Sequence, residues 1–407
     1  MAKSENLKYI DFRIGVLHLE LTSRCNLLCP MCGRTTGMDG NGKNLKKRDD
    51  LDLTDTDPRV LEKMLEDMKP FLPNHVFING NYGDPIMYPY LLEVIRMYKD
   101  AGVRQLTLST NGSAQTEDWW RELAQIMKTP DKVIFAIDGL EDTNHLYRVN
   151  SKWNIIMRNA KAFIAEGGRA RWDYIGFAHN EHQIDEAKQL AEDMGFWKFR
   201  YKKSNRYVIP THYDGEEVEQ IVKRTELTFV AKQHVAQKKK QDAQQIRKDK
   251  ALETILAAPK KQANTTEKVD AVIKKHKTFD NYVKNTEIEC QTARDKSIFV
   301  DYQGKVWPCC WQGHYYSKIG HDSATPTRIQ DNKNMWERYG EGFNDLANHG
   351  IFDILKTPYF NNDLVDSWKT GSDNRLWICG KTCGKELDFR GNGEQNFEDT
   401  EIKQNGK

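Results

Sequence analysis

The sequence predicts an α/β fold in which a mostly parallel sheet forms a partial, open (β/α)6 barrel. Between residues 16 and 202, six short segments rich in β-branched and aromatic residues alternate with five segments of helical period. Strands that are separated by helices pair in parallel through right-handed crossovers. Six strands are too few to close an eight-stranded barrel, so we expect the sheet to stay open.

The individual elements follow from local signals. Asp57 can cap the first helix, Pro58 suits its first turn, and apolar residues recur along one face to Met68. Two later helices end at glycines, Gly102 and Gly195, as helix C-termini prefer. The predicted strands are residues 16–21, 75–79, 105–110, 132–138, 171–177 and 198–202, and the predicted later helices are residues 91–101, 117–127, 153–166 and 184–194.

The chain of 407 residues is long enough for two or three domains. Its last third contains a predicted β-hairpin at residues 297–308, which turns at Gln303-Gly304. We expect a small C-terminal α+β domain there, separated from the barrel by a basic helical insertion. The predicted divisions are an N-terminal extension (1–13), the barrel core (14–205), the basic, largely helical insertion or linker (206–286), the cysteine-rich C-terminal domain (287–390) and a polar tail (391–407).

Residues 219–278 differ from the rest in charge. They contain fifteen Lys or Arg against seven Asp or Glu, a net charge of +8, whereas the whole chain carries +2. Short amphipathic pieces lie at residues 252–256 and 269–273, with Pro259 between them. A solvated helical insertion explains such a charge run. The alternative is a docking arm for an acidic partner or a leader peptide.

Composition excludes several classes of protein. No apolar run is long enough to span a bilayer, and the first residues lack the apolar core of a secretion signal. The small net charge of the whole chain gives no bias toward a membrane or nucleic acid. We therefore expect a cytoplasmic protein that has neither as a partner.

Three cysteines follow the first predicted strand with the spacing C-x3-C-x2-C: Cys25, Cys29 and Cys32. Three thiolates can bind three irons of a [4Fe-4S] cluster and leave the fourth iron open. An open coordination site on a redox cluster indicates chemistry rather than scaffolding. A structural zinc site is the alternative, but zinc usually takes four ligands and the next cysteine is Cys290. A disulfide is disfavoured in a reducing compartment.

This loop resembles the signature of the radical S-adenosylmethionine (radical SAM) enzymes, and the resemblance covers roughly residues 14–205. It implies that the amino and carboxylate groups of S-adenosylmethionine chelate the open iron. One electron from the cluster would then cleave the sulfonium and free a 5′-deoxyadenosyl radical. Met31 stands where the family often has an aromatic residue, and this apolar side chain could pack beside the adenine.

Polar turns follow the next strands, at the edge where open parallel sheets bind ligands. Residues 79–85 carry glycines that allow close approach to a ligand, and they are similar to the family's Gly-Gly-Glu-Pro segment, which holds the amino group of S-adenosylmethionine. Each turn alone is also explained as a plain turn, but their order along the chain matches the family. The resemblance implies that S-adenosylmethionine contacts Met31, Tyr82, Gly83, Asp84, Pro85, Ser109, Asn111, Asp138, Arg148 and Asn180.

Several of these residues have expected roles. Ser109 and Asn111 end the third strand, where short polar groups suit ribose hydroxyls, although Asn-Gly is also a common turn. Arg148 could fork onto the methionine carboxylate, as an arginine does in similar enzymes, or it could form a surface ion pair. Asn180 occupies a place where relatives contact the nucleoside.

The other five cysteines all lie after residue 289. Four thiolates gathered from this region would fully ligate a second [4Fe-4S] cluster. The layout resembles the SPASM domain, or its shortened twitch form, of many radical SAM enzymes, and five cysteines supply one such cluster. A four-thiolate zinc site is the alternative. The expected ligands are Cys290, Cys309, Cys379 and Cys383, with Cys310 as an alternative to Cys309.

The resemblance implies an enzyme that abstracts hydrogen from a peptide or protein side chain. The alternatives are a small-molecule or nucleotide substrate, as in molybdenum-cofactor synthesis, and a non-catalytic metal-binding adaptor. The implied cofactors are two [4Fe-4S] clusters and S-adenosylmethionine. The implied partners are an electron donor, such as flavodoxin or ferredoxin, and a peptide or protein substrate that docks on the basic insertion. No residue identifies the substrate or a catalytic acid or base.

Overall fold

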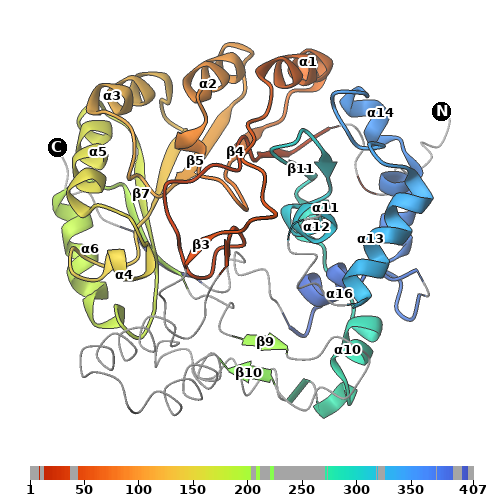
Figure 1. Cartoon of the computed structure of the whole chain (residues 1–407). Coiled ribbons are helices and arrows are strands. Elements are labelled where there is room, and N and C mark those ends of the chain that lie inside the picture. The colour runs from red at the N-terminus through yellow and green to blue at the C-terminus, as the bar shows by residue number, and fades with distance from the viewer. Residues whose placement is uncertain are drawn as a thin grey trace.

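A nine-stranded sheet forms the centre of the computed structural model, in the order β12-β11-β1-β4-β5-β6-β7-β8-β13 (Figure 1). Its middle strands pair in parallel, each with the next along the chain. The predicted open, mostly parallel α/β sheet is therefore confirmed. The structure describes residues 9, 13–36, 45–202, 271–272, 274–317, 319, 326–372 and 374–387, and the backbone of the strands at 208–210, 221–223 and 397–401.

The six predicted strands are present, and each ends within two residues of its predicted end. Buried residues recur at every second position of these strands, such as Leu17 and Leu19 in the first strand and Trp172 and Tyr174 in the fifth. Side chains two positions apart lie on the same face of a strand, so the members of each of these pairs share one face of the sheet. The strands are β1 (Val16–Leu19), β4 (His75–Ile78), β5 (Gln105–Thr110), β6 (Lys132–Ala136), β7 (Ala170–Ile175) and β8 (Lys198–Lys202).

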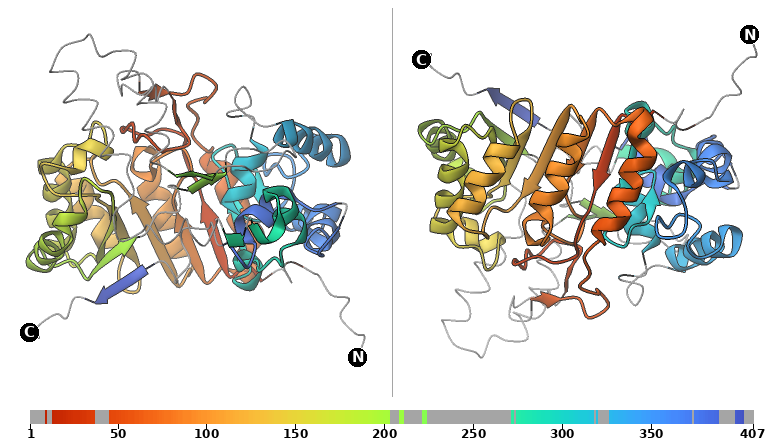
Figure 2. Two further views of the ribbon diagram at one scale, coloured as in Figure 1. Left: turned by 90° about the horizontal axis from the view of Figure 1, so that it is seen from below. Right: turned by 90° about the horizontal axis from the view of Figure 1, so that it is seen from above.

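The five predicted helices cover the outer face of the sheet (Figure 2). Asp57 caps the first by accepting a hydrogen bond from the backbone of Arg59, and Pro58 begins it, as predicted. A short helix that was not predicted, α4 (Asn144–Tyr147), follows β6. The five are α1 (Pro58–Met68), α2 (Leu91–Asp100), α3 (Glu117–Ile126), α5 (Trp153–Ala165) and α6 (Ile184–Asp193), and short 3-10 turns lie at η1 (Lys69–Phe71), η2 (Pro85–Met87) and η3 (Glu181–Gln183).

The predicted C-terminal hairpin is present, and it belongs to the same sheet as the barrel. Strand β11 (Ser297–Val300) pairs in parallel with β1, and β12 (Val306–Trp307) pairs antiparallel with β11. The cysteine-rich region thus extends the sheet beyond its six predicted strands. A five-residue strand in the tail, β13 (Phe397–Glu401), adds to the opposite edge by antiparallel pairing with β8.

The helices of the C-terminal region gather at the hairpin edge of the sheet (Figure 2). Large aromatic side chains fill the space between them, and Trp307 stacks on Tyr316 at 5.7 Å between ring centroids. These helices are α10 (Phe279–Asn285), α11 (Gln291–Arg294), α12 (Cys310–Tyr316), α13 (Pro326–Tyr339), α14 (Ile351–Leu355), η7 (Tyr359–Asp363), α15 (Leu364–Asp366) and α16 (Trp377–Cys383).

Most of the basic stretch at 219–278, including the amphipathic piece at 252–256, lies outside the described residues. Two short strands pair antiparallel there, β9 (Val208–Pro210) before this stretch and β10 (Ile221–Lys223) within it. A second small pair, β2 (Thr35–Thr36) and β3 (Lys46–Lys47), follows the first cysteine loop.

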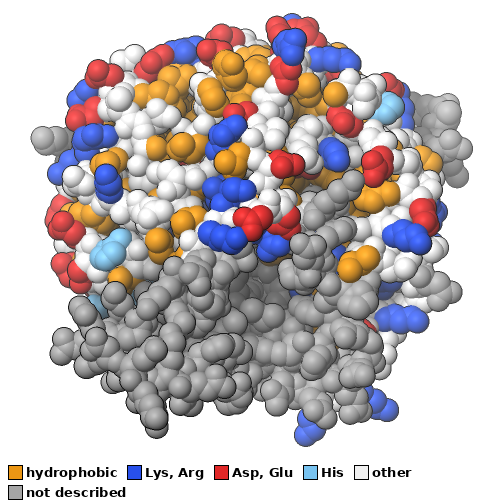
Figure 3. Space-filling model, in the orientation of Figure 1, with side chains coloured by type: hydrophobic (Ala, Val, Ile, Leu, Met, Phe, Trp, Pro, Cys, Tyr) orange, Lys and Arg blue, Asp and Glu red, His pale blue; other side chains and the backbone are white. Residues whose placement is uncertain are grey.

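None of the helices in the described ranges combines the length and apolar character needed to cross a membrane. Positive and negative side chains are interspersed over the described part of the face in Figure 3.

Candidate functional site

The first three cysteines lie on one loop that leaves the C-terminal end of β1. The loop folds back on itself, because the backbone of Cys32 donates to Cys29 O at 3.1 Å. Cys25 and Cys32 are partly exposed, whereas Cys29 is buried. Burial is the main cause that raises the pKa of Cys25 to about 12 and of Cys29 to about 11. Three neighbouring thiols at the edge of a parallel sheet fit three ligands of one cluster.

Arg34 holds this loop in place through hydrogen bonds to main-chain carbonyls. The sequence did not predict this role. Its guanidinium donates to the backbone carbonyls of Ser23 (2.5 Å), Cys25 (3.2 Å) and Tyr82 (3.3 Å), and the residue is 4% exposed. These bonds join the cysteine loop to the turn that follows β4. Its place two residues after the last cysteine is the one sequence signal that could have suggested it.

Glu20 was also missed. It is 1% exposed at the end of β1, and its Oε1 accepts from the backbone N–H groups of Tyr82 (2.7 Å) and Gly83 (3.4 Å). Burial raises the pKa of Glu20 to about 8. Gly83 allows the turn after β4 to lie against the backbone at Thr22, because a Cβ at Gly83 would lie 1.8 Å from the carbonyl oxygen of Thr22. The turn after β4 therefore packs directly on the chain that leads to the cysteines.

The carboxylate of Asp84 accepts hydrogen bonds from neighbouring protein groups. The donors are Thr110 Oγ1 and the backbone of Asn111, both at 2.7 Å, and the backbone of Ile86 at 3.2 Å. Both oxygens are thus used in tying the turn after β4, which continues into Pro85, to the end of β5. Asp84 sets the position of Asn111, and a contact of its own with S-adenosylmethionine stays a prediction.

Asn111 reaches the first cysteine. Its Nδ2 lies 3.8 Å from Cys25 Sγ and donates to Asn26 Oδ1 at 3.0 Å. Ser113 donates to Asn111 Oδ1 and so orients the amide. Ser109, two positions earlier on β5, is partly exposed.

Arg148 forms a buried ion pair rather than a surface one. Its Nε donates to Asp138 Oδ2 at 2.7 Å, and the side chains are 17% and 0% exposed. Its Nη1 lies 3.9 Å from Cys29 Sγ. Asn180 donates to the carbonyl of Asp138 at 2.9 Å, so it supports this pair through the backbone. The guanidinium therefore lies beside the thiols, where an anionic group could reach it.

An apolar cluster borders the same thiols. Met31 packs against a group that contains Leu27, Cys29, Tyr147 and Phe177. The rings of Tyr147 and Phe177 lie 4.3 Å apart between centroids. An apolar surface next to polar groups suits a nucleoside that has a flat base and a polar ribose.

Tyr82 and its neighbour Asn81 join the first cysteine loop to the C-terminal region. The hydroxyl of Tyr82 lies 2.6 Å from His314 Nδ1 and 3.0 Å from Ser317 Oγ. Asn81 Nδ2 donates to the carbonyl of Cys310 at 3.0 Å. The predicted contact residue Tyr82 thus has its hydroxyl turned toward α12.

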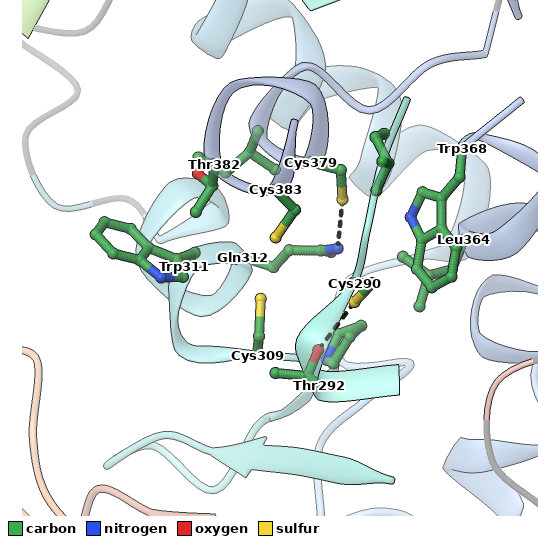
Figure 4. A pocket seen from close by; sticks show the side chains of 13 residues that line it. Cys290, Thr292, Cys309, Trp311, Gln312, Leu364, Trp368, Cys379, Thr382 and Cys383 are labelled. Atoms are coloured by element: carbon green, nitrogen blue, oxygen red, sulfur yellow. Dashed lines mark hydrogen bonds between the residues drawn. The ribbon is translucent and has the colours of Figure 1, made fainter. Parts of the chain in front are cut away.

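The predicted second set of cysteines lines one cavity (Figure 4). Cys290 precedes α11, Cys309 precedes α12, and Cys379 and Cys383 lie one turn apart on α16. The thiol of Cys383 hydrogen-bonds to Cys290 and lowers its pKa. Cys310 is not among the lining residues. The other lining side chains are largely apolar and include Pro308, Trp311, Leu364, Trp368 and Ile378.

The arrangement of these thiols bears on the kind of group that they could hold. Within the described ranges, no three His, Cys, Asp or Glu side chains are close enough together to bind one metal ion. A zinc ion would need four sulfur atoms around a single point. In a [4Fe-4S] cluster each thiolate binds a different iron, so the sulfur atoms stand further apart. Four thiols that line one cavity supply the number of ligands that either group takes.

The chain matches a known family over its barrel. Residues 19–194 match the model of the Radical SAM superfamily. The tungsten-containing aldehyde ferredoxin oxidoreductase cofactor-modifying protein of Pyrococcus furiosus is 33% identical over 124 residues, which are 30% of this chain and 31% of that protein. The chain thus spans about a third of this curated relative.

Two solved structures are similar at lower identity. SuiB of Streptococcus suis, bound to precursor peptide SuiA, has a TM-score of 0.43 and 15% identity, with 74% of this chain and 60% of SuiB covered. The enzyme anSMEcpe with bound AdoMet and Cp18Cys peptide has a TM-score of 0.47 and 13% identity, with 91% and 89% covered.

Proposed function

We propose that this chain reductively cleaves S-adenosylmethionine and abstracts a hydrogen atom from a peptide or protein side chain. The premise is that it is an enzyme of the radical SAM class, with its domain at residues 19–194. The observation that carries this proposal is the set of three thiols on one loop at the C-terminal end of β1. The loop lies inside the residues that match the family.

We assign the first cluster to Cys25, Cys29 and Cys32. When bound, the cluster and S-adenosylmethionine together supply the 5′-deoxyadenosyl radical. Residues of the chain would bind and orient S-adenosylmethionine at this cluster. Arg148, held by Asp138, offers a forked cation for the methionine carboxylate, and Asn111 offers an amide beside Cys25. Met31 and its apolar neighbours exclude water from the adenine side.

We assign a second [4Fe-4S] cluster to Cys290, Cys309, Cys379 and Cys383. The shared cavity and its apolar lining support this assignment. The position of Cys310 outside the lining supports Cys309 as the ligand of the adjacent pair. An electron donor of the flavodoxin or ferredoxin class would reduce the enzyme.

The peptide substrate rests on the resemblance of the cysteine-rich region to SPASM and twitch domains. The overall likeness to SuiB and anSMEcpe is too low to identify a substrate for this chain. The second candidate is a small molecule, and the name of the curated relative, a cofactor-modifying protein, favours it.

The first experiment tests the chemistry without a substrate. The protein is reconstituted with iron and sulfide without oxygen, reduced with dithionite and incubated with S-adenosylmethionine. We expect about eight irons per chain, four for each cluster, and 5′-deoxyadenosine by chromatography. Changing Cys25, Cys29 and Cys32 together to Ala should halve the iron and abolish the product. The change Cys310→Ala is the matched control and should leave both unchanged.

Two results would contradict the proposal. Full iron in the triple variant would show that these thiols do not hold a cluster. Full iron in the wild type without 5′-deoxyadenosine would favour the metal-binding adaptor. To separate the two substrate classes, short peptides encoded beside this gene are incubated with the enzyme and analysed by mass spectrometry. A modified peptide supports the first class, and unmodified peptides with active cofactor cleavage support a small molecule.

A further inference from the structure

One sulfur atom of the second thiol cavity lies next to a buried amide. Gln312, on the first turn of α12, is 2% exposed, and its Nε2 donates to Cys379 Sγ at 3.3 Å. Figure 4 shows the Gln312 side chain running across the cavity to this thiol. An amide that is buried at a sulfur atom needs a partner for its other end, because an unsatisfied carbonyl in the interior is costly.

Tyr359 supplies that partner and sets the direction of the amide. Its hydroxyl donates to Gln312 Oε1, and the tyrosine is 1% exposed. A thiolate only accepts hydrogen bonds, so the amide must turn its NH2 group toward Cys379 and its oxygen toward the phenol. The hydrogen bonds therefore run in one direction, from the Tyr359 hydroxyl to the Gln312 carbonyl oxygen and from the Gln312 NH2 group to Cys379 Sγ.

Trp368 places a second N–H group at the same cavity. Its indole lines the cavity, and among the described residues its buried Nε1 has no partner within hydrogen-bond geometry. The cavity therefore has a second buried N–H group besides that of Gln312.

We propose that Gln312, oriented by Tyr359, and Trp368 are positioning residues that raise the reduction potential of the second cluster, Gln312 through the sulfur atom of Cys379 and Trp368 through its N–H group at the cavity wall. The inference rests on the second cluster of the proposed function. One electron added to a cluster increases the negative charge that its sulfur atoms share, and N–H donors stabilise that charge. A fixed donor network stabilises the reduced form more than the oxidised form, and so makes the cluster a better electron acceptor.

The test isolates this cluster in the full-length chain. Cys25, Cys29 and Cys32 are changed to Ala so that a single cluster titrates, and its reduction is followed by electron paramagnetic resonance against solution potential. We add Gln312→Met, Trp368→Phe or Tyr359→Phe to this background. The control is Gln330→Met, the same change at an exposed position of α13.

We expect Gln312→Met to lower the reduction equilibrium constant at least tenfold, which is a shift of about 59 mV to more negative potential for one electron. Trp368→Phe should shift it in the same direction. Tyr359→Phe should shift it less, because the amide stays but loses its fixed orientation. Gln330→Met should leave the potential unchanged.

The outcomes separate this inference from the proposal beneath it. Four irons in the triple-cysteine background with unshifted potentials in Gln312→Met and Trp368→Phe would overturn the inference alone. No iron in that background would overturn the second cluster, and the inference with it. If Gln312→Met loses its iron because the cavity collapses, Trp368→Phe decides, since it removes the N–H group and keeps an aromatic side chain in the lining.

Discussion

The two thiol regions of this protein are built in opposite ways. The first has three cysteines on one loop. Arg34 holds this loop in place by donating hydrogen bonds to its main-chain carbonyls. The second collects four cysteines from residues 290 to 383, and only the packing of α11, α12 and α16 brings them together. A local site can be recognised from spacing, whereas a dispersed site depends on the fold.

The regions also differ in the side chains that approach the sulfur atoms. Arg148 lies 3.9 Å from Cys29, and its charge is shared with a fully buried aspartate. In the second region the neutral amide of Gln312 lies 3.3 Å from Cys379 Sγ, and the hydroxyl of Thr292 lies 3.2 Å from Cys290 Sγ. The first region thus carries a cation that an anionic ligand could share, whereas the groups that approach the sulfur atoms of the second region are neutral.

The largest expected effect concerns the buried ion pair of the first region. The change Arg148→Met leaves Asp138 buried without its cation, which should destabilise the fold by about 3–5 kcal/mol. The measurement is urea unfolding followed by circular dichroism. Arg96→Met is the control, because Arg96 and its partner Glu122 are 43% and 46% exposed, and it should cost less than about 1 kcal/mol. Equal losses in the two variants would contradict a special buried pair.

The next effect is a pH dependence that comes from Glu20. Its pKa is raised from 4.5 to about 8 by burial, so the folded state holds a proton that the unfolded state releases. Stability from this group is full below about pH 4.5 and is lost as the pH rises to 8. Glu20→Gln keeps an oxygen for Tyr82 N–H and removes the titration.

Unfolding free energies of the wild type and Glu20→Gln are compared between pH 5 and pH 8. The wild type should fall relative to the variant by on the order of 3 kcal/mol over this range. Glu66→Gln, on the exposed face of α1, is the control and should run parallel to the wild type. Parallel curves for Glu20→Gln would show that the carboxyl is ionised throughout.

The smallest expected effect tests the hydrogen bonds by which Tyr82 connects the two regions. Tyr82→Phe removes the hydroxyl that bonds to His314 and Ser317 and keeps the ring. We expect a loss of about 1 kcal/mol, since each such bond contributes little net stability. The iron content of both clusters should not change. Loss of iron from one region would show that this hydroxyl supports metal binding directly.

Much of the barrel was predictable because its signals are local. Period and capping located α1 from Asp57 to Met68, and the ends of β5 and β8 agree with their predicted residues. The entry of β11 into the same sheet was not predictable. Its pairing with β1 joins residues almost 300 positions apart, and no local pattern encodes such a neighbour.

The candidate site divides in the same way. The three-cysteine loop and the order of the polar turns were visible in the sequence. Arg34 and Glu20 were not, because their partners are backbone groups, which every residue has. The engagement of Asp84 by Thr110 and Asn111 was hidden for a related reason, since it needs the ends of β4 and β5 to lie side by side.

By itself, the sequence determined the alternation of strands and helices, the radical SAM resemblance and the identity of the eight cysteines. Those features depend on neighbours a few residues apart. Tertiary structure alone decided that four distant thiols line one cavity, that Cys310 stays outside it and that Gln312 faces Cys379. Such contacts arise when burial of apolar surface packs distant segments together, and their geometry is set by that packing rather than by spacing along the chain.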